Sequence, residues 1–446
     1  MPTLPLQVDR DDPRPLPTQI AAQVRELALS GRVADGARLP STRALAADLG
    51  VSRGVAEQAW DQLRAEGWLE GRRGSGTWLR VGGFAQRAVE SPATRRGVDE
   101  ELVMMDAGTP WRDPRQSALW RRAWREVSTA DPPRAYEEPG GIEELRVALA
   151  ERLRRTRGLA VEPDQVLVTS GTVGGLRQLF AALSPGEIAI EDPGFRAAVV
   201  TAELAGRVVR SLPVGEGAES DLAGCAGAYV TPSHQHPTGR VLPADERLAL
   251  LRRAEGSGCV VIEDDYDSEF RYDVAPVPAL ASMAPGRVAY LGTASKTVLP
   301  SLRLGWMVLP ESLHGAVLAH RAVTFDMPPW PVQKAFATLL RDGHVDAVIR
   351  SARKVYAARA EKVVAALSPH AELAGPVAGM YSTWLLEPDR ALRAREAMAA
   401  AGFRINLLAD YCRNADLSGL LVGFGGPTDA EFELALEVLV SALSRS

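Results

Sequence analysis

Five short apolar segments between residues 165 and 293 constrain the fold most strongly. They are QVLVTSG (165–171), GEIAIEDPG (186–194), GAYVTPS (227–233), GCVVIEDD (258–265) and RVAYLGT (287–293). Each is almost continuously apolar and ends in Gly, Ser, Thr or Asp, and helix-patterned sequence separates several of them. This pattern is typical of a largely parallel sheet covered by helices on both faces. Because ligands bind at the carboxyl ends of strands in such sheets, the closing polar residues are candidates for chemistry.

The length of 446 residues exceeds what one ordinary core needs, so two or three domains are expected. The segment around residues 82–101 mixes Gly, Pro, Ser and charges without a helical or strand period, which is typical of a linker. We therefore predict a small domain over residues 1–80, a linker over 81–105 and a large domain over 106–446. The C-terminal end of the large domain is expected to form a small α+β subdomain.

Composition excludes several classes of protein. No apolar run reaches the roughly 18 residues of a membrane span, and the N-terminus has no signal core. The three cysteines, Cys225, Cys259 and Cys412, are too few and too widely spaced for a disulfide framework or a metal site. We expect a cytoplasmic protein without a metal. The net charge of −5 argues against nucleic-acid binding over the whole surface but allows a local basic element.

The first 80 residues predict a winged helix-turn-helix. A first helix over residues 15–31 places Ile20, Val24, Leu27 and Ala28 on one face. Ser41 and Ser52 can cap a second helix (42–50) and a third (53–67), and residues 68–79 read as two short strands around a Gly- and Arg-rich turn. In this arrangement the N-terminal residues of the third helix enter the major groove of double-stranded DNA.

The stretch from residue 36 to 79 also closely resembles the GntR family of bacterial repressors. The motifs LPSTRALA, LGVSR, AEGWLE and GSGT occur in that order. The helix starts, the wing and the resemblance together give the DNA-contact candidates Arg43, Ser52, Arg53, Arg72, Arg73 and Gly76. Because residues 1–80 hold 11 Arg against 10 Asp plus Glu, DNA binding must depend on where the arginines lie. The alternative is an unrelated small helical domain.

Lys296 is one of only four lysines in a chain whose other cations are arginines. An amine can lose its proton and act as a nucleophile, whereas a guanidinium cannot. Lys296 follows a predicted strand, and the other strands end in Asp264 and in the turn Ser170–Thr172. Pyridoxal 5′-phosphate (PLP) would use all of these, because it needs an amine for its aldehyde, a carboxylate for its ring nitrogen, and N–H groups, hydroxyls and an arginine for its phosphate.

From about residue 136 onward the chain resembles the fold-type I aminotransferases, through SKTVLPSLRLGW, SGT and EDPGF. The resemblance implies that Lys296 is the Schiff-base lysine, that Asp264 is the partner of the ring nitrogen and that Tyr266 donates to the phenolate oxygen. It implies that Phe195 stacks on the cofactor and that Tyr136 reaches the phosphate of a second subunit, so that a homodimer is expected. The residues it places at the phosphate are Ser170, Gly171, Thr172, Thr293 and Arg303. Ser295, beside Lys296, is a further cofactor-binding candidate.

The whole arrangement resembles the MocR/GabR regulators, which join a GntR module to an aminotransferase-like domain and act as transcription factors. Two positions depart from the aminotransferase pattern. His236 stands where those enzymes have an asparagine at the phenolate oxygen, and it either donates to the cofactor or only fills space. Leu421 stands where they have the arginine that clamps the α-carboxylate of the substrate, which makes ordinary transamination doubtful. Arg196 or Arg404 would be an alternative anion site.

The interpretation is a PLP-dependent DNA-binding transcriptional regulator, in which PLP, or an amine or amino acid that reacts with it at Lys296, alters operator binding. PLP itself is a candidate effector, as in regulators of vitamin B6 synthesis of this subfamily. An amine that lacks an α-carboxylate and an amino acid held by another arginine are the other candidates. One alternative is an active aminotransferase with an autoregulatory DNA-binding arm. Another is a cofactor-free dimerisation scaffold attached to the DNA-binding module.

Overall fold

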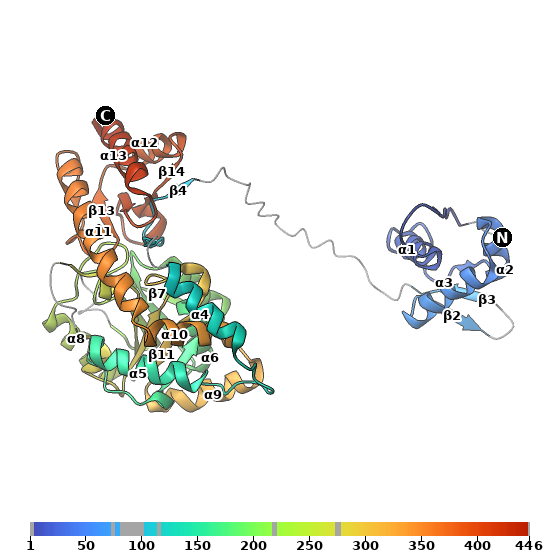
Figure 1. Cartoon of the computed structure of the whole chain (residues 1–446), viewed down its shortest axis with the longest axis horizontal. Coiled ribbons are helices and arrows are strands. Elements are labelled where there is room, and N and C mark those ends of the chain that lie inside the picture. Colours follow the sequence, from blue (N-terminus) through green and yellow to red (C-terminus); the bar gives the residue numbers. More distant parts are fainter. Residues whose placement is uncertain are drawn as a thin grey trace. The chain divides into compact units, whose positions relative to one another are not determined.

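The computed structural model describes residues 4–72, 76–80, 102–113, 117–215, 221–272 and 278–444, without the side chains of residues 71 and 72. The chain divides into two compact units, Met1–Arg96 and Gly97–Ser446, which are treated separately (Figure 1).

The smaller unit is a helix-turn-helix with a three-stranded wing. Its elements in order are α1 (Leu16–Leu29), β1 (Arg38–Leu39), α2 (Thr42–Leu49), α3 (Arg53–Ala65), β2 (Leu69–Arg72) and β3 (Gly76–Leu79). The hydroxyls of Ser41 and Ser52 accept hydrogen bonds from the first turns of α2 and α3, as their positions predicted. The sheet order is β1-β3-β2, and the short strand β1 was not predicted.

The core of the smaller unit forms where the three helices meet. Ile20 and Val24 of α1 pack with Leu63 of α3, and all three are almost fully buried. Trp60 is also completely buried, and its ring N–H donates to the carbonyl of Pro40 at 3.3 Å. This bond ties α3 to the segment that precedes α2, so the core fixes the direction of α3.

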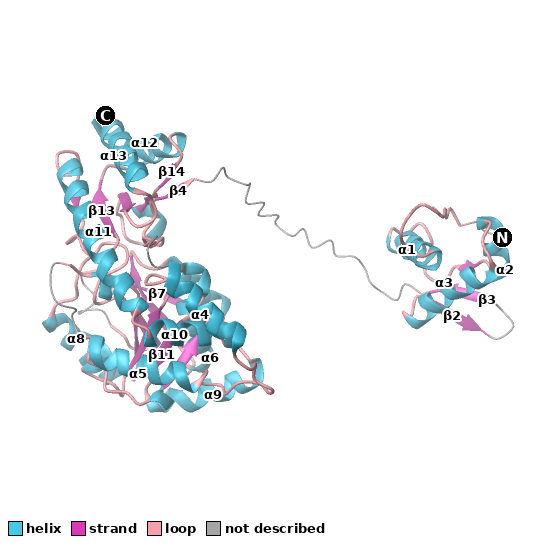
Figure 2. Cartoon of the chain, in the orientation of Figure 1, coloured by secondary structure: helices cyan, strands magenta, loops and turns pink. Residues whose placement is uncertain are grey.

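The larger unit is built on a seven-stranded sheet of order β5-β11-β10-β9-β8-β6-β7 (Figure 2). Its strands are β5 (Val166–Thr169), β6 (Glu187–Asp192), β7 (Val209–Pro213), β8 (Cys225–Val230), β9 (Val260–Asp265), β10 (Val288–Thr293) and β11 (Gly305–Val308). Only β11 runs antiparallel to its neighbours. The prediction of a mostly parallel sheet is therefore confirmed.

Helices cover both faces of this sheet. They are α4 (Ser117–Thr129), α5 (Glu143–Arg157), α6 (Gly171–Ala182), α7 (Arg196–Leu204), α8 (Ala244–Ser257), α9 (Glu311–Thr324), α10 (Trp330–Arg341) and α11 (His344–Leu367). The 3₁₀ turns are Pro163–Gln165, Ser268–Phe270, Leu280–Ser282, Pro300–Leu302 and Leu408–Tyr411. Along β9, Val261 and Ile262 enter two separate apolar clusters, one on each face, because successive side chains of a strand point to opposite sides.

The chain ends in a small α+β subdomain. Its sheet has the order β12 (Glu372–Leu373), β13 (Tyr381–Leu385), β16 (Gly419–Gly423), β15 (Asn406–Leu407), and α12 (Pro388–Ala400) and α13 (Asp429–Ser444) pack together. A separate pair joins β4 (Val103–Met104) to β14 (Phe403–Arg404) in parallel. The first described residues after the 81–101 segment therefore pair with a strand from the C-terminal part of the chain.

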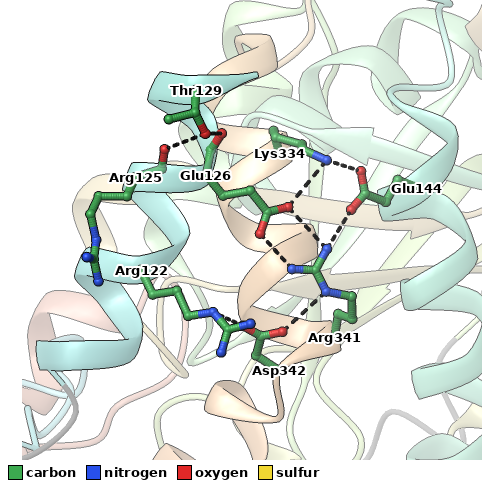
Figure 3. A network of polar contacts seen from close by, with 8 residues as sticks. All are labelled: Arg122, Arg125, Glu126, Thr129, Glu144, Lys334, Arg341 and Asp342. Atoms are coloured by element: carbon green, nitrogen blue, oxygen red, sulfur yellow. Dashed lines mark hydrogen bonds and ion pairs between the residues drawn. The ribbon is translucent and has the colours of Figure 1, made fainter. Parts of the chain in front are cut away.

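Ion pairs hold α4 against α10 and α5 (Figure 3). Arg341 of α10 contacts Glu126 of α4 at 2.7 Å and Glu144 of α5 at 3.4 Å, and Lys334 bridges the same two carboxylates at 3.6 and 2.6 Å. The Arg341 guanidinium lowers the pKa of Glu126 to about 2. These pairs are partly exposed, so their main effect is to fix the register of three helices rather than to add much stability.

Among the described residues, no helix has the length and apolar character needed to cross a membrane. The same part of the chain contains no group of three His, Cys, Asp or Glu side chains with the geometry of a metal site.

Candidate cofactor-binding site

The predicted cofactor residues gather at the carboxyl edge of the seven-stranded sheet. Lys296 follows β10, Asp264 lies near the end of β9, and the two strands are adjacent and parallel, with Leu291 opposite Asp264. Ser170 follows β5 as the N-cap of α6, and Phe195 follows β6 as the N-cap of α7. The topology thus brings together residues that lie 126 positions apart in the chain, between Ser170 and Lys296.

Asp264 is the buried carboxylate of the site. One of its oxygens, Oδ2, accepts a hydrogen bond from the hydroxyl of Tyr229 on β8 at 2.6 Å. Burial raises the pKa of Asp264 to about 7, and the hydrogen bond from Tyr229 opposes that rise. Its other oxygen, Oδ1, is buried and has no hydrogen-bond partner among the described residues. A buried acceptor of this kind is costly unless a donor reaches it, so Asp264 fits a ligand that brings an N–H group.

Lys296 points back toward the start of the larger unit. Its Nζ donates to the carbonyl oxygen of Gly108 at 2.8 Å. Burial lowers the pKa of Lys296, while the carboxylates of Asp106, Asp267 and Asp264 oppose that shift. A lowered amine pKa increases the unprotonated fraction, which is the form that reacts with a carbonyl carbon.

Tyr266 belongs to a hydrogen-bonded group beside Asp264. Its hydroxyl lies 2.8 Å from the hydroxyl of Tyr381 on β13 and 3.0 Å from the carbonyl oxygen of His234. The ring of His234 contacts Asp267 through Nδ1 at 2.7 Å, and its buried Nε2 has no partner among the described residues. The Tyr266 hydroxyl donates its one proton to the His234 carbonyl, so donation to a ligand oxygen would replace that bond.

His236 lies in an aromatic enclosure. Its ring contacts Phe195, Tyr266, Tyr381 and Tyr411 edge-on, at centroid distances between 5.0 and 5.9 Å. Burial lowers its pKa to about 3, with smaller contributions from Lys296 and His234. The ring is consequently neutral at pH 7 and carries one N–H donor. Both interpretations of His236, as donor and as space filler, agree with this position.

The predicted phosphate residues meet at the start of α6. The guanidinium of Arg303 donates to the carbonyl of Ser170 at 3.4 Å and lies 3.5 Å from the position that a Cβ on Gly171 would occupy. Arg303 has a φ of 49° and Gly171 a φ of 79°, so both adopt the left-handed conformation. Thr293, which ends β10, accepts the N–H of Ser295 on its hydroxyl at 3.2 Å. Thr172 lies in the first turn of α6, where free N–H groups favour an anion.

Tyr136 lies away from these residues within one chain. Its side chain is 84% exposed, and its ring packs on Phe325 with centroids 4.7 Å apart. Phe325 has a φ of 51°, in the left-handed region. This exposed aromatic pair agrees with a role toward a second subunit, which stays a prediction.

Leu421 occupies the middle of β16 and is completely buried. It pairs with Thr383 of β13 and with Asn406 of β15, so the three side chains share one face of the small sheet. That face is directed at the site, because Tyr381 lies two residues before Thr383 and its hydroxyl contacts Tyr266. The position of the missing clamp arginine is thus filled by an apolar side chain. Arg404 and Arg196, the alternatives considered, are both exposed, on β14 and α7.

In the smaller unit, Arg43, Ser52 and Arg53 are exposed at the starts of α2 and α3. Arg53 pairs with Glu57 at 2.8 Å, one turn along α3. Gly76 opens β3 with a φ of 114°. Arg73 and the side chain of Arg72 lie outside the described residues.

Sequence reasoning missed Tyr229, His234, Tyr381 and Asp106. Tyr229 had a detectable signal, since it ends a predicted strand beside the one that carries Asp264. His234 lies only two residues before His236, whereas Tyr381 and Asp106 come from parts of the chain that no motif marked. Arg38 was also missed. It is exposed on β1, and its Nε lies 3.0 Å from the Cβ position of Gly76 in the wing.

Comparison with protein families assigns both units. Residues 105–416 match "Aminotransferase class I and II", and residues 16–79 match "Bacterial regulatory proteins, gntR family". A similar relative is the HTH-type pyridoxine biosynthesis transcriptional regulator PdxR of Corynebacterium glutamicum, 32% identical over 99% of each chain. The chain belongs to the MocR/GabR-type transcriptional regulators.

Two further relatives have the same organisation. The probable rhizopine catabolism regulatory protein MocR of Rhizobium meliloti is 33% identical, over 82% of this chain and 80% of that protein. TauR of Rhodobacter capsulatus is 33% identical, over 84% and 86%. The fold of about three quarters of this chain is also seen in a solved aminotransferase. An archaeal alanine:glyoxylate aminotransferase is 24% identical over 77% of this chain and 91% of its own, with a TM-score of 0.69, which shows the fold alone.

Proposed function

We propose that this MocR/GabR-type chain binds PLP at Lys296 and that occupancy of this site changes operator binding by the smaller unit. The observation that carries the proposal is the buried Oδ1 of Asp264, which has no partner among the described residues. The pyridine nitrogen of PLP has the donor that this oxygen lacks, and a buried carboxylate next to it keeps the ring protonated. The fit rests on donor chemistry and burial in this chain as well as on the family.

The residues present would hold each part of the cofactor. Asp264 takes the ring nitrogen, Tyr266 with or without His236 takes the phenolate oxygen, and Phe195 covers the ring. Ser170, Gly171, Thr172, Thr293, Ser295 and Arg303 would hold the phosphate at the start of α6. When bound, PLP would supply an aldehyde that forms a covalent bond to an amine and a ring that withdraws electrons.

A structural route connects Lys296 to the start of the larger unit. The Gly108 carbonyl that accepts from Lys296 Nζ lies four residues after the end of β4, the first described strand that follows residues 81–101. The carboxylate of Asp106 fixes the same turn by accepting from the N–H groups of Gly108 and Thr109 at 2.9 and 2.7 Å. A covalent change at Nζ removes N–H donors, so it weakens this contact in the segment that leads to the smaller unit. That change is the physical basis proposed for regulation.

The partners follow from the same proposal. The chain would act as a cytoplasmic homodimer, with Tyr136 reaching the phosphate of the second subunit and two smaller units reading spaced half-sites on double-stranded DNA. The name of the PdxR relative points to pyridoxine synthesis as the regulated process, which would make PLP itself the effector. Leu421 argues against turnover of α-amino acids, so we propose a regulator and no steady-state aminotransferase.

The test is PLP-dependent operator binding by Lys296→Ala and by Lys354→Ala, a control that removes an exposed lysine of α11. The Lys296 variant should lose the visible absorbance of the lysine-bound cofactor and the effect of PLP on operator affinity. The control should retain both. Regulation by PLP that persists unchanged in Lys296→Ala would refute the proposal, and steady-state amino-group exchange with a keto acid would establish an enzyme.

A further inference from the structure

We propose that Asp106 makes this site selective for amines that lack an α-carboxylate and carry a second cationic group, such as a short aliphatic diamine. The proposal rests on the proposed function, since the ligand would react at the cofactor that Lys296 holds. It adds a class of ligand and a residue that selects it. Neither follows from the family or from the names of the relatives.

The carboxylate of Asp106 is held in one orientation by hydrogen bonds to one of its oxygens, and the other oxygen has no hydrogen-bond partner among the described residues. Oδ1 accepts the two N–H groups of Gly108 and Thr109, whereas no hydrogen bond or ion pair of the described residues uses Oδ2. Both carboxylate oxygens and Lys296 Nζ lie 3.4 to 3.5 Å from the point where a Cβ on Gly108 would be. The carboxylate and the amine therefore face the same small space.

The other two carboxylates near Lys296 each have one oxygen engaged. Oδ2 of Asp264 accepts from Tyr229, and its Oδ1 is the partner proposed for the ring nitrogen of the cofactor. Oδ2 of Asp267 contacts the His234 ring. Burial raises the pKa of Tyr411 to about 12, and the charge of the half-buried Asp106 adds to that rise. The ring of Tyr411 packs against His236.

Asp106 lies beside the position where a clamp arginine would stand. The N–H of Gly423 donates to the carbonyl of Met105 at 2.9 Å, and a Cβ on Gly423 would collide with the carbonyl oxygen of Asp106. Gly423 is two residues after Leu421 on β16, so both occupy the site-directed face of the strand. The strand that carries Leu421 thus packs against the backbone of Asp106, whose carboxylate faces Lys296 Nζ.

A second observation points to a ligand that has hydrogen-bond donors. Asn406, the cross-strand neighbour of Leu421, has a buried Oδ1 without a partner among the described residues. An unpaired acceptor and a negative charge on one side of the site both favour an ammonium group and disfavour a carboxylate. Arg404 is exposed on β14, and its charge opposes the rise that burial causes in the pKa of Tyr411.

Binding needs no further reagent. The ligand amine would replace Lys296 Nζ on the cofactor carbon, and its two protons would pass to Nζ, so no electron would be gained or lost. The second amine would stay protonated and pair with the free oxygen of Asp106.

The experiment compares three probes on the PLP-loaded full chain: 1,4-diaminobutane, butylamine and 4-aminobutanoate, with L-alanine as the α-carboxylate case. Binding is read from the shift in visible absorbance and from operator affinity. We expect the diamine to bind more tightly than butylamine by on the order of 10-fold, and both carboxylates to bind more weakly than butylamine. In Asp106→Asn, which keeps the oxygen that accepts from Gly108 and Thr109, the diamine and butylamine should bind about equally.

Three further variants make the outcome decisive. Asp106→Glu keeps the charge and should keep a preference for the diamine, and Asp410→Asn removes an exposed carboxylate near Tyr411 and should leave the preference unchanged. Arg404→Ala should also leave it unchanged. Equal binding of the probes by the unaltered protein, or a preference for the diamine that survives in Asp106→Asn, would overturn the role of Asp106 and leave the proposed function standing. A chain that acquires no visible absorbance with PLP would overturn the proposed function as well.

Discussion

Asp264→Asn should stabilise the cofactor-free protein and at the same time weaken PLP binding. The substitution removes a buried charge whose Oδ1 has no partner in the described part of the chain. The amide oxygen of asparagine can still accept the hydrogen bond that Tyr229 now donates to Oδ2. The change therefore separates the charge of residue 264 from its packing.

The magnitude follows from the pKa of Asp264, which burial raises from 3.8 to about 7. At pH values below the pKa of Asp264 in the unfolded chain, both the native and the unfolded state hold the proton, and the carboxyl does not change the free energy of unfolding. Between the two values the unfolded chain ionises first, so the stability of the native protein falls as the pH rises, by about 1.4 kcal/mol per pH unit. Above about pH 7 the loss levels off at roughly 4 kcal/mol, which is the most that Asp264→Asn can restore.

The measurement is urea denaturation of the PLP-free protein and of Asp264→Asn at pH 5 and pH 8, at one protomer concentration. The advantage of the variant should be larger at pH 8, and its affinity for PLP should fall on the order of 10-fold or more, since a charge-assisted hydrogen bond is lost. Burial also raises the pKa values of Glu191 and Glu263 to about 7. Because both proteins contain these two residues, their contribution to the pH dependence cancels when the stability of one protein is subtracted from that of the other at each pH. A stability difference that does not depend on pH, or unaltered PLP affinity, would refute the reasoning.

Two other substitutions test the two units separately. If Arg53 contacts a phosphate, Arg53→Ala should weaken binding to all operator sequences and reduce the slope of log affinity against log salt concentration by about one. Mobility-shift titrations at several salt concentrations measure this slope. An unchanged slope counts against the contact. Arg157→Met should destabilise the larger unit by roughly 3–5 kcal/mol, because Arg157 and Asp265 form a buried pair at 2.5 Å. Adding Asp265→Leu should recover part of that loss in urea denaturation, and no recovery would show that the pair is not the cause.

The sequence predicted the architecture well because the strongest signals were local. Each of the five apolar runs became a strand of the seven-stranded sheet, and the serines before α2 and α3 cap them as expected. A buried parallel strand needs a continuous apolar run, and a cap needs one residue type at one position. The antiparallel strand β11 lies within the stretch that follows Lys296, where the chain reverses within a few residues.

Individual residues of the site were predictable from the sequence, but the contacts between them were not. Lys296 and Asp264 were identified by residue type and by their place at strand ends. The roles of Asp106 and Tyr381 became visible only in the fold, which brings Asp106 next to Lys296 and Tyr381 next to Tyr266. Contacts across such separations leave no period in the sequence. Pairing register, not composition, decides which side chains meet.

Leu421 illustrates how a missing residue and a present one must be considered together. Leucine in place of the clamp arginine, taken alone, only removes a binding site for the α-carboxylate of a substrate. The structure adds that the backbone of Asp106 packs on the same strand at Gly423 and that one oxygen of its carboxylate has no partner among the described residues. Under the proposal made for Asp106, the site would discriminate between ligands by differential affinity, favouring an ammonium group and disfavouring a carboxylate.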